Sequence, residues 1–347
     1  MAWNREQRSS LAWVRSLLAA AALALGSAGP AHAAEPVWDG NKVEIRSEPL
    51  APGVYAFFAD DADTLNAKGG AAATSGGLIV GSQGALLIET MLNRRLHDQV
   101  RALVRQATPL PIVYAVNSSA HGDHPFGNIY LPPVTGIVQH QRTAQFVGTH
   151  LADDKAFMIQ NFGAGRGIEE IQARSGDVLI GDGASITLDV GGKQVQIMDF
   201  GFSQTGGDLF VWVPVSKVMW AGNPIIAGKP SLPWLLDGHL VQTLATLKKL
   251  QTFQPADARI VPGHGVPMAR DWLQWHIDYL EAVKTQGHAV GVPRLRVVRL
   301  GSPGLERACG RQGFEVGEAV MRHELRPGVN GHQASDSAAS AQVGRLL

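Results

Sequence analysis

The chain of 347 residues carries 30 Lys and Arg against 30 Asp and Glu, and 45% of its residues are hydrophobic. This composition can bury a substantial core, and it lacks the basic excess that is typical of nucleic-acid-binding proteins. The single cysteine, Cys309, excludes an intramolecular disulfide, and no catalytic cysteine signature surrounds it. The length allows one large domain or two small ones.

The first 33 residues have the pattern of an export signal. Three arginines precede the apolar stretch 17–25, and small residues lead to the A-x-A pattern of Ala31-His32-Ala33. A membrane anchor is the alternative, but the apolar stretch is about half the ~20 residues that a span needs. We therefore expect residues 1–33 to be cleaved and the mature protein to be periplasmic or secreted, with no membrane span left.

In the first half of the mature chain, apolar runs bounded by glycine precede a helical pattern. Residues 92–106 predict an amphipathic helix, because apolar residues recur on one face and charged residues on the other. Pro109 and Pro111 follow this helix and end it. The apolar runs predict strands at 53–58, 77–80, 84–89 and 112–116.

The second half repeats this alternation without repeating the sequence. Two runs around Gly191-Gly192 predict a β-hairpin, and helical patterns cover 240–250 and 272–284. Strands with helices between them, twice over, indicate a layered α/β arrangement. The predicted strands are 186–190, 194–198, 209–213, 218–221 and 258–261.

A cluster of metal-ligand side chains follows the predicted strand 112–116. Inside the segment 117–128, the four residues 121–124 include His121, Asp123 and His124. Imidazole nitrogen and carboxylate oxygen are ligands that suit zinc or non-haem iron. A short turn can present several of them to one point, so the segment predicts a metal site.

This segment resembles the HxHxDH signature of the metallo-β-lactamase superfamily, with Ser119 in the place of the first histidine. The residues 262–265, Pro-Gly-His-Gly, match the last histidine motif of the superfamily without change. The resemblance covers about residues 45–285. It implies an αββα sandwich, in which two mixed sheets lie face to face with helices outside and the metal at one sheet edge.

Two further turns resemble superfamily motifs with one ligand changed in each. The turn 203–208 aligns with an H-T-x-G-D segment, so that Gln204 stands where a histidine is expected. The turn 221–223 aligns with A-G-D, so that Asn223 stands where a bridging aspartate is expected. Because the two turns and both histidine motifs follow predicted strands, their ligand positions are expected to converge.

The resemblance divides the ligands between two metal positions. The first would be held by Ser119, His121 and Gln204, of which only the histidine is a good zinc ligand, so we expect this position to be empty or weak. The second would be held by Asp123, His124 and His264, which leave a coordination position for water. The resemblance therefore predicts one Zn²⁺ per chain, with Fe²⁺ as the alternative.

Three side chains then need roles other than ligation. Ser119, Gln204 and Asn223 are expected to form hydrogen bonds with the substrate or with a developing oxyanion. His121 and Asp123 are the expected catalytic residues. For His121 three interpretations stay open: a general base that positions the attacking water, the one strong ligand of a weak second metal, or a hydrogen-bonded histidine that lines the pocket.

These features predict a metal-dependent hydrolase that activates water against an ester, thioester or amide-like small molecule. One alternative is a ligand-binding pseudoenzyme on the same fold. Another is a mononuclear iron dioxygenase acting on a thiol or persulfide, because two histidines and one carboxylate also form a facial triad. The substrate does not follow from the sequence, since this fold hosts many reactions.

The expected domain division is a signal peptide over 1–33, a metallo-β-lactamase-like domain over 34–287 and a tail over 288–347. The tail is rich in Gly, Ser and Ala and has eight arginines without periodicity, which favours partial disorder. Outside the motifs, His140 follows a further apolar run, and a surface or packing role is expected for it. The oligomeric state does not follow from the sequence.

Overall fold

The computed structural model describes residues 37–68, 70, 72–228 and 239–289. The predicted signal peptide, Cys309 and nearly all of the tail lie outside these ranges, so their assignments stay predictions. Within the described part, no helix is both long and apolar enough to cross a membrane.

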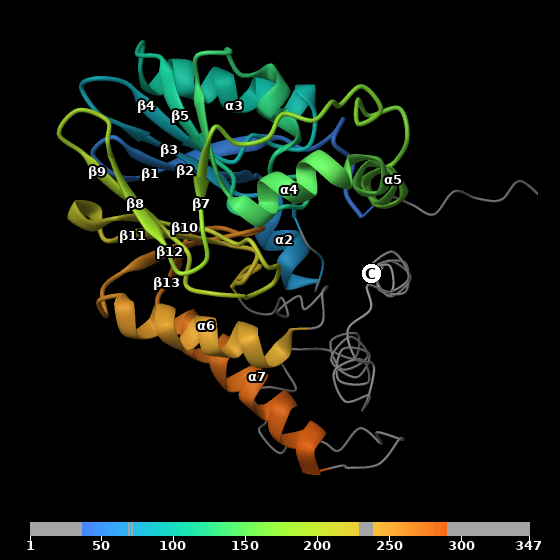
Figure 1. Ribbon diagram of the computed structural model, residues 1–347, viewed down its shortest axis with the longest axis vertical. Helices are drawn as coiled ribbons and strands as arrows, with labels where there is room; N and C mark the ends of the chain where they lie inside the picture. The colour runs from blue at the N-terminus through green and yellow to red at the C-terminus, as the bar shows by residue number, and fades with distance from the viewer. Residues whose placement is uncertain (1–36, 69, 71, 229–238, 290–347) are drawn as a thin grey trace, which may run out of the picture. The chain divides into compact units, whose positions relative to one another are not determined.

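Two mixed β-sheets form the centre of the described domain (Figure 1). The seven-stranded sheet has its strands in chain order, and it is antiparallel from β1 to β4 and parallel from β4 to β7. Parallel strands end at the same sheet edge, which brings the residues after β4 and β5 together. The strands are β1 Ile45–Ala51, β2 Val54–Ala59, β3 Gly76–Val80, β4 Ala85–Ile88, β5 Ile112–Val116, β6 Gly136–His140 and β7 Val178–Ile180.

The six-stranded sheet has the order β13-β12-β11-β10-β9-β8. Its strands pair antiparallel except for β11 and β12, which are parallel. The residues that follow β11 and β12 therefore also emerge at a common edge. The strands are β8 Ser185–Asp189, β9 Gln194–Met198, β10 Phe210–Val213, β11 Val218–Gly222, β12 Arg259–Pro262 and β13 Met268–Ala269.

Helices cover the outer face of each sheet, as Figure 1 shows for α3 on one side and for α6 and α7 on the other. Their apolar faces bury residues such as Leu96 of α3 and Leu247 of α6 against the strands. The α-helices are α2 Ala62–Ala67, α3 Arg94–Ala107, α4 Gln141–Thr149, α5 Leu151–Phe162, α6 Leu240–Phe253 and α7 Asp271–Ala289, with short 3₁₀ turns η1 Phe126–Tyr130 and η2 Pro214–Ser216.

Neighbouring side chains of one strand pack on opposite faces of its sheet. In β2, Phe57 packs with the residues under α3, whereas its neighbour Phe58 packs between the two sheets. In β10, Phe210 faces α6 and α7, whereas Val211 faces the other sheet. Because successive side chains of a strand point to opposite faces, fully apolar runs mark strands that are buried on both sides.

The centre of the sandwich depends on one close approach. Trp220 of β11 is 1% exposed, and its indole N–H donates to the carbonyl oxygen of Gly76 at 2.9 Å. The ring lies over Gly77, where a Cβ atom would come within 2.4 Å of it. Glycine at position 77 therefore leaves the space that the tryptophan fills.

The predicted αββα architecture is confirmed, with two sheets face to face and helices outside. All nine predicted strands and all three predicted helices are present, and their ends differ from the predicted ones by at most five residues. Weakly patterned elements were not predicted, notably β1, α2, α4, α5 and β7.

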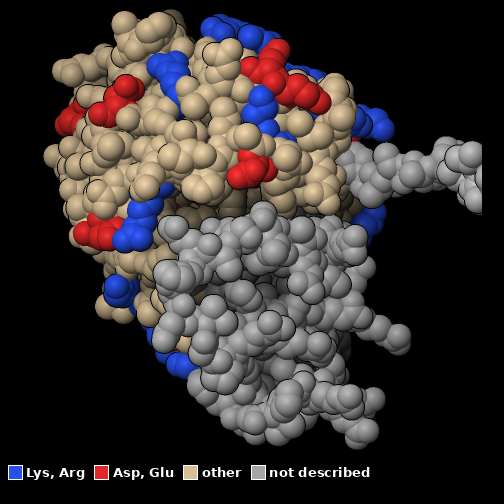
Figure 2. Space-filling model, turned by 45° about the vertical axis from the view of Figure 1, so that its right-hand side comes forward, with Lys and Arg blue, Asp and Glu red and all other residues tan. Residues whose placement is uncertain are grey.

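On the face shown in Figure 2, basic and acidic side chains are interspersed over the described residues.

Candidate metal centre

The histidine-rich turn is fixed by hydrogen bonds to its backbone. The carbonyl oxygen of His124 accepts from the amide and the hydroxyl of Thr90, each at 3.0 Å. The amide of His124 donates to the carbonyl oxygen of His121 at 2.9 Å, which closes the turn. Asn117 supports the turn from β5, since its amide group bonds the carbonyl of His124 and the side chain of Asn128. Side chains that project from this turn therefore have a defined direction.

Three side chains converge from the two halves of the domain. Asp123 and His124 follow β5, and His264 follows β12. The Oδ2 atom of Asp123 lies 3.4 Å from Nε2 of His264 and 3.8 Å from Nε2 of His124. Bonds of 2.0–2.2 Å in a tetrahedral zinc site separate neighbouring ligand atoms by about 3.4 Å. The three atoms are thus spaced as ligands of one ion.

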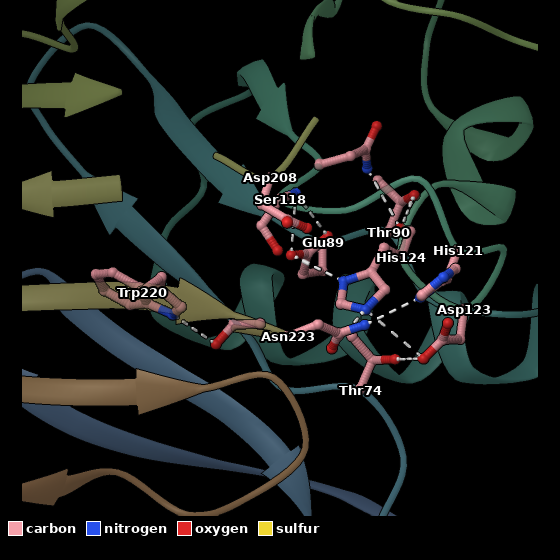
Figure 3. Close-up of polar contacts among 12 residues, drawn as sticks. Thr74, Glu89, Thr90, Ser118, His121, Asp123, His124, Asp208, Trp220 and Asn223 are labelled. Atoms are coloured by element: carbon pink, nitrogen blue, oxygen red, sulfur yellow. Dashed lines mark hydrogen bonds and ion pairs between the residues drawn. The ribbon is translucent and has the colours of Figure 1, made fainter. Parts of the chain in front are cut away.

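In His124 and His264, the partner of Nδ1 orients the ring so that Nε2 points toward Asp123. Nδ1 of His264 lies 2.8 Å from the carbonyl oxygen of Ala72, so this nitrogen carries the proton and donates. Nδ1 of His124 lies 3.1 Å from the carboxylate of Glu89. Both rings therefore direct Nε2 toward Asp123. A bound metal ion would replace the Nε2 proton of His124 there, as metal binding displaces protons from its ligands. Figure 3 shows the ring of His124 between Glu89 and Asn223.

Acidic side chains dominate the electrostatics around His124. Burial alone would lower its pKa, but the carboxylates of Glu89 and Asp123 outweigh burial and raise the pKa to about 9. Burial would raise the pKa of Asp123, but His124, His264 and a hydrogen bond from Thr74 at 2.5 Å keep it below its usual value. Asp123 is therefore ionised at neutral pH.

Four carboxylates are buried in the described part of the chain, and all belong to this region. Glu89, Asp123, Asp154 and Asp208 are each at most 7% exposed, and none of the buried side chains of the described residues is Lys or Arg. Asp154 interacts electrostatically with Asp123 and His124, and Asp208 does so with His124. Burial and the neighbouring Asp123 raise the pKa of Asp154 well above its usual value, so this carboxyl adds little negative charge. The three other carboxylates exceed the single counter-charge of His124, and this surplus favours a bound cation.

No model of a known protein family matches the sequence. Solved structures match over about 70% of this chain and nearly all of their own length, and they include TMB-1 at 14% identity and TM-score 0.53 and DIM-1 metallo-β-lactamase at 17% identity and TM-score 0.51. A metallo-β-lactamase from Hirschia baltica matches 68% of this chain at 17% identity and TM-score 0.51, with 97% of its own chain covered.

The chain has the metallo-β-lactamase fold. The predicted fold is therefore confirmed, at low sequence identity. Its candidate metal-binding group is Asp123, His124 and His264, at the edge where a metallo-β-lactamase-like metal centre was expected.

At three positions this chain has another residue where the metallo-β-lactamase superfamily is expected to have a metal ligand. Two of these side chains have no hydrogen-bond partner within the described residues, whereas the third has two. Ser119 and Gln204 are buried, and their side-chain polar atoms have no hydrogen-bond partner within the described residues. Asn223 instead bonds both histidines of the turn. Its Nδ2 lies 3.2 Å from Nδ1 of His121, and its Oδ1 lies 3.1 Å from Nε2 of His124.

The contact with Asn223 defines the protonation of His121. Burial lowers the pKa of His121 to about 4, so the ring is neutral at pH 7. Nδ1 accepts the amide N–H of Asn223, which leaves the ring proton on Nε2. His121 therefore offers a hydrogen-bond donor and not a second metal-ligand lone pair.

A second group of ligand-type side chains lies around His140, outside the predicted site. His140, Asp182 and Asp199 have side-chain atoms within 4.8 Å of one another, next to a cavity of about 620 Å³ lined by Arg142, Lys249 and Phe202. Nδ1 of His140 accepts the amide N–H of Arg142 at the start of α4, so the proton is on Nε2, 3.3 Å from Asp182. Asp182 also pairs with the Arg142 guanidinium. Both features disfavour a cation there, and the buried ring matches the expected packing role.

Two residues of the centre were not predicted. Glu89 lies at the end of β4 with φ of +62°, a left-handed conformation that is rare for residues other than glycine. A single acidic residue after the apolar run of β4 was the available signal. Thr74, which bonds Asp123, lies in a stretch of small residues that gives no signal of a site.

Proposed function

We propose that this protein is a metal-dependent hydrolase with one Zn²⁺ per chain, held by Asp123, His124 and His264. The observation that carries the proposal is the convergence of these three ligand atoms, with both imidazoles oriented by partners on Nδ1. Three protein ligands leave a position for water, as in catalytic zinc sites. The surplus of buried carboxylates supports the binding of a cation.

The surrounding side chains suit a hydrolytic reaction. A bound zinc ion would polarise a carbonyl group and lower the pKa of its water toward ~7. His121, neutral and protonated on Nε2, would hold an oxygen atom of water or substrate by donation, which is a positioning role. Thr74 and Glu89 would keep Asp123 and His124 in place through the hydrogen bond and the ion pair described above. The substrate would be a small molecule with an ester, thioester or amide-like bond.

Elemental analysis of protein purified without added metal tests this proposal. The wild type should contain about one zinc per chain, His264→Ala should contain almost none, and the exposed-site control His150→Ala should match the wild type. Hydrolysis of an ester, thioester and amide panel should follow the zinc content. Iron in place of zinc, with oxygen consumption on thiols, would replace the proposal by the dioxygenase. Protein without any metal would replace it by the ligand-binding pseudoenzyme.

A further inference from the structure

Ser119 and Gln204, like the adjacent Ser118, are buried polar side chains that have no hydrogen-bond partner within the described part of the chain. They are 0% and 1% exposed, and Oγ of Ser119 and both amide atoms of Gln204 have no hydrogen-bond partner among the described residues. A buried donor or acceptor without a partner carries a free-energy cost that native structures rarely keep. The unpaired atoms point to an external group that pairs with them.

Hydrogen bonds fix the backbone on both sides of Gln204, although its own side-chain amide has no partner among the described residues. The carboxylate of Asp208 accepts hydrogen bonds from Ser203 Oγ at 2.7 Å, from the amide of Thr205 at 2.6 Å and from Thr205 Oγ1 at 2.9 Å. Thr243 of α6 donates to the carbonyl of Ser203 at 2.8 Å. Both neighbours of Gln204 are thus fixed, while its own amide stays available.

The turn that carries Gln204 is joined to the segment that carries Ser119. The amide of Leu209, directly after the turn, donates to the carbonyl oxygen of Ser118 at 2.9 Å. The amide of Ser118 in turn donates to the carboxylate of Glu89 at 3.2 Å. The segments that carry Ser119 and Gln204 are therefore linked to each other and, through Glu89, to His124.

Charge limits the class of group that these side chains can take. The buried ionisable groups of this region are carboxylates and histidines, and no buried Lys or Arg of the described residues stands near them. An anionic group of a ligand would face these carboxylates, with only His124 and a bound zinc ion to offset their charge. The unpaired side chains are neutral, and a neutral partner fits them best.

We infer that Ser119 and Gln204 form a subsite for an amide group of the substrate, an inference that rests on the proposed function of the neighbouring metal centre. Oε1 of Gln204 accepts the amide N–H, and Nε2 of Gln204 or the hydroxyl of Ser119 donates to the amide carbonyl. An ester or ketone offers acceptors alone and leaves Oε1 unpaired. The subsite therefore selects for amides over esters at this place in the substrate.

Binding of three small probes tests the subsite. Phenylacetamide offers N–H and C=O, phenylacetone offers C=O alone, and phenylacetate is an anion. In zinc-loaded wild type, phenylacetamide should bind about tenfold or more tightly than phenylacetone, because the ketone leaves a buried acceptor unpaired. Titrations followed by ligand-observed NMR give the dissociation constants. Equal binding of the amide and the ketone, or preferred binding of the anion, would overturn the inference.

Variants show whether the preference comes from these residues. Gln204→Leu should abolish the preference, and Ser119→Ala should weaken phenylacetamide binding several-fold. Gln254→Leu is the matched control, because Gln254 is also buried with an unpaired amide but follows α6 at the other end of β12. Removing an unpaired buried amide should leave the melting temperature of Gln204→Leu unchanged or higher. An amide preference that survives in both Gln204→Leu and Ser119→Ala would overturn the inference.

Repeating the titrations after chelation separates the inference from the proposed function. An amide preference in protein that never binds zinc would remove the hydrolase but keep the subsite. Zinc binding and turnover without an amide preference would remove the subsite but keep the hydrolase. A crystal structure in which ordered waters pair with Gln204 and stay in place at saturating phenylacetamide would also overturn the inference.

Discussion

The carboxylate of Glu89 lies 3.1 Å from Nδ1 of His124, and both side chains are at most 1% exposed. Glu89 adopts φ of +62° at the end of β4, so the backbone accepts strain where this side chain is presented. The contact between Glu89 and His124 fixes the orientation of the imidazole and places a negative charge beside it. Such outer partners tune metal sites almost as strongly as the ligands themselves.

Replacement of Glu89 should therefore weaken metal binding. Gln at this position keeps the length and the hydrogen-bond acceptor but removes the charge, so we expect the zinc dissociation constant of Glu89→Gln to rise about 10- to 100-fold. Competition with a chelating indicator measures this constant at fixed pH. Glu170→Gln, which removes a half-exposed carboxylate on the loop after α5, should leave it unchanged. An unaltered constant in Glu89→Gln would show that the pair does not support the metal.

Metal-ligand side chains placed at positions 119, 204 and 223 should create a second zinc site. In the triple variant Ser119→His, Gln204→His and Asn223→Asp, two imidazoles and a carboxylate join His121, and the contact that occupies Nδ1 of His121 is removed. We expect the zinc content to rise from about one to about two per chain, as measured by elemental analysis after dialysis. The single variant Asn223→Asp should stay near one. A triple variant that still holds one zinc would contradict the role assigned to these positions.

The packing of Trp220 on Gly77 predicts a loss of stability in Gly77→Ala. The added methyl group would meet ring atoms at 2.4–2.6 Å, so the free energy of unfolding should fall by about 1–3 kcal/mol. Gly148→Ala in α4 is the control, since its nearest neighbour would be 3.9 Å away, and it should raise stability by about 0.5–1 kcal/mol. Urea denaturation measures both. Equal stability of Gly77→Ala and wild type would show that the sheets can separate at little cost.

Acid should destabilise the protein partly through His276. This ring is fully buried against the carbonyl of Ala227, and burial lowers its pKa to about 4. The unfolded chain takes up a proton near pH 6.5, whereas the folded protein does so only near pH 4, so the stabilising contribution is complete above pH 6.5 and is lost as the pH falls to 4. The loss from this residue approaches about 3 kcal/mol.

The measurement compares wild type with His276→Gln in chelator, so that metal release does not contribute. The difference in free energy of unfolding between the two proteins should shrink as the pH falls from 7.5 to 4.5. His150→Gln, at an exposed histidine, should follow the wild type at every pH. A difference between wild type and His276→Gln that stays constant with pH would remove His276 as a source of acid sensitivity.

Sequence patterns determined the architecture of this protein and the residue types of its centre. Uninterrupted apolar runs such as 85–88 and 210–213 are buried throughout, and this strong pattern placed these strands correctly. Short or polar elements such as β7 and α4 depend on contacts with distant residues, so local sequence does not specify them. His121, Asp123 and His124 were visible because they lie together in one turn.

Only the tertiary structure decided how these residues act. The side chain of Asn223 reaches His121 and His124 across 99 or more residues of sequence, and Glu89 reaches His124 from another strand. The tautomers of three histidines, and the unpaired amide of Gln204, follow from such long-range neighbours. Hydrogen-bond partners and electrostatic fields depend on distance in space, and sequence periodicity carries no information about which strand ends meet.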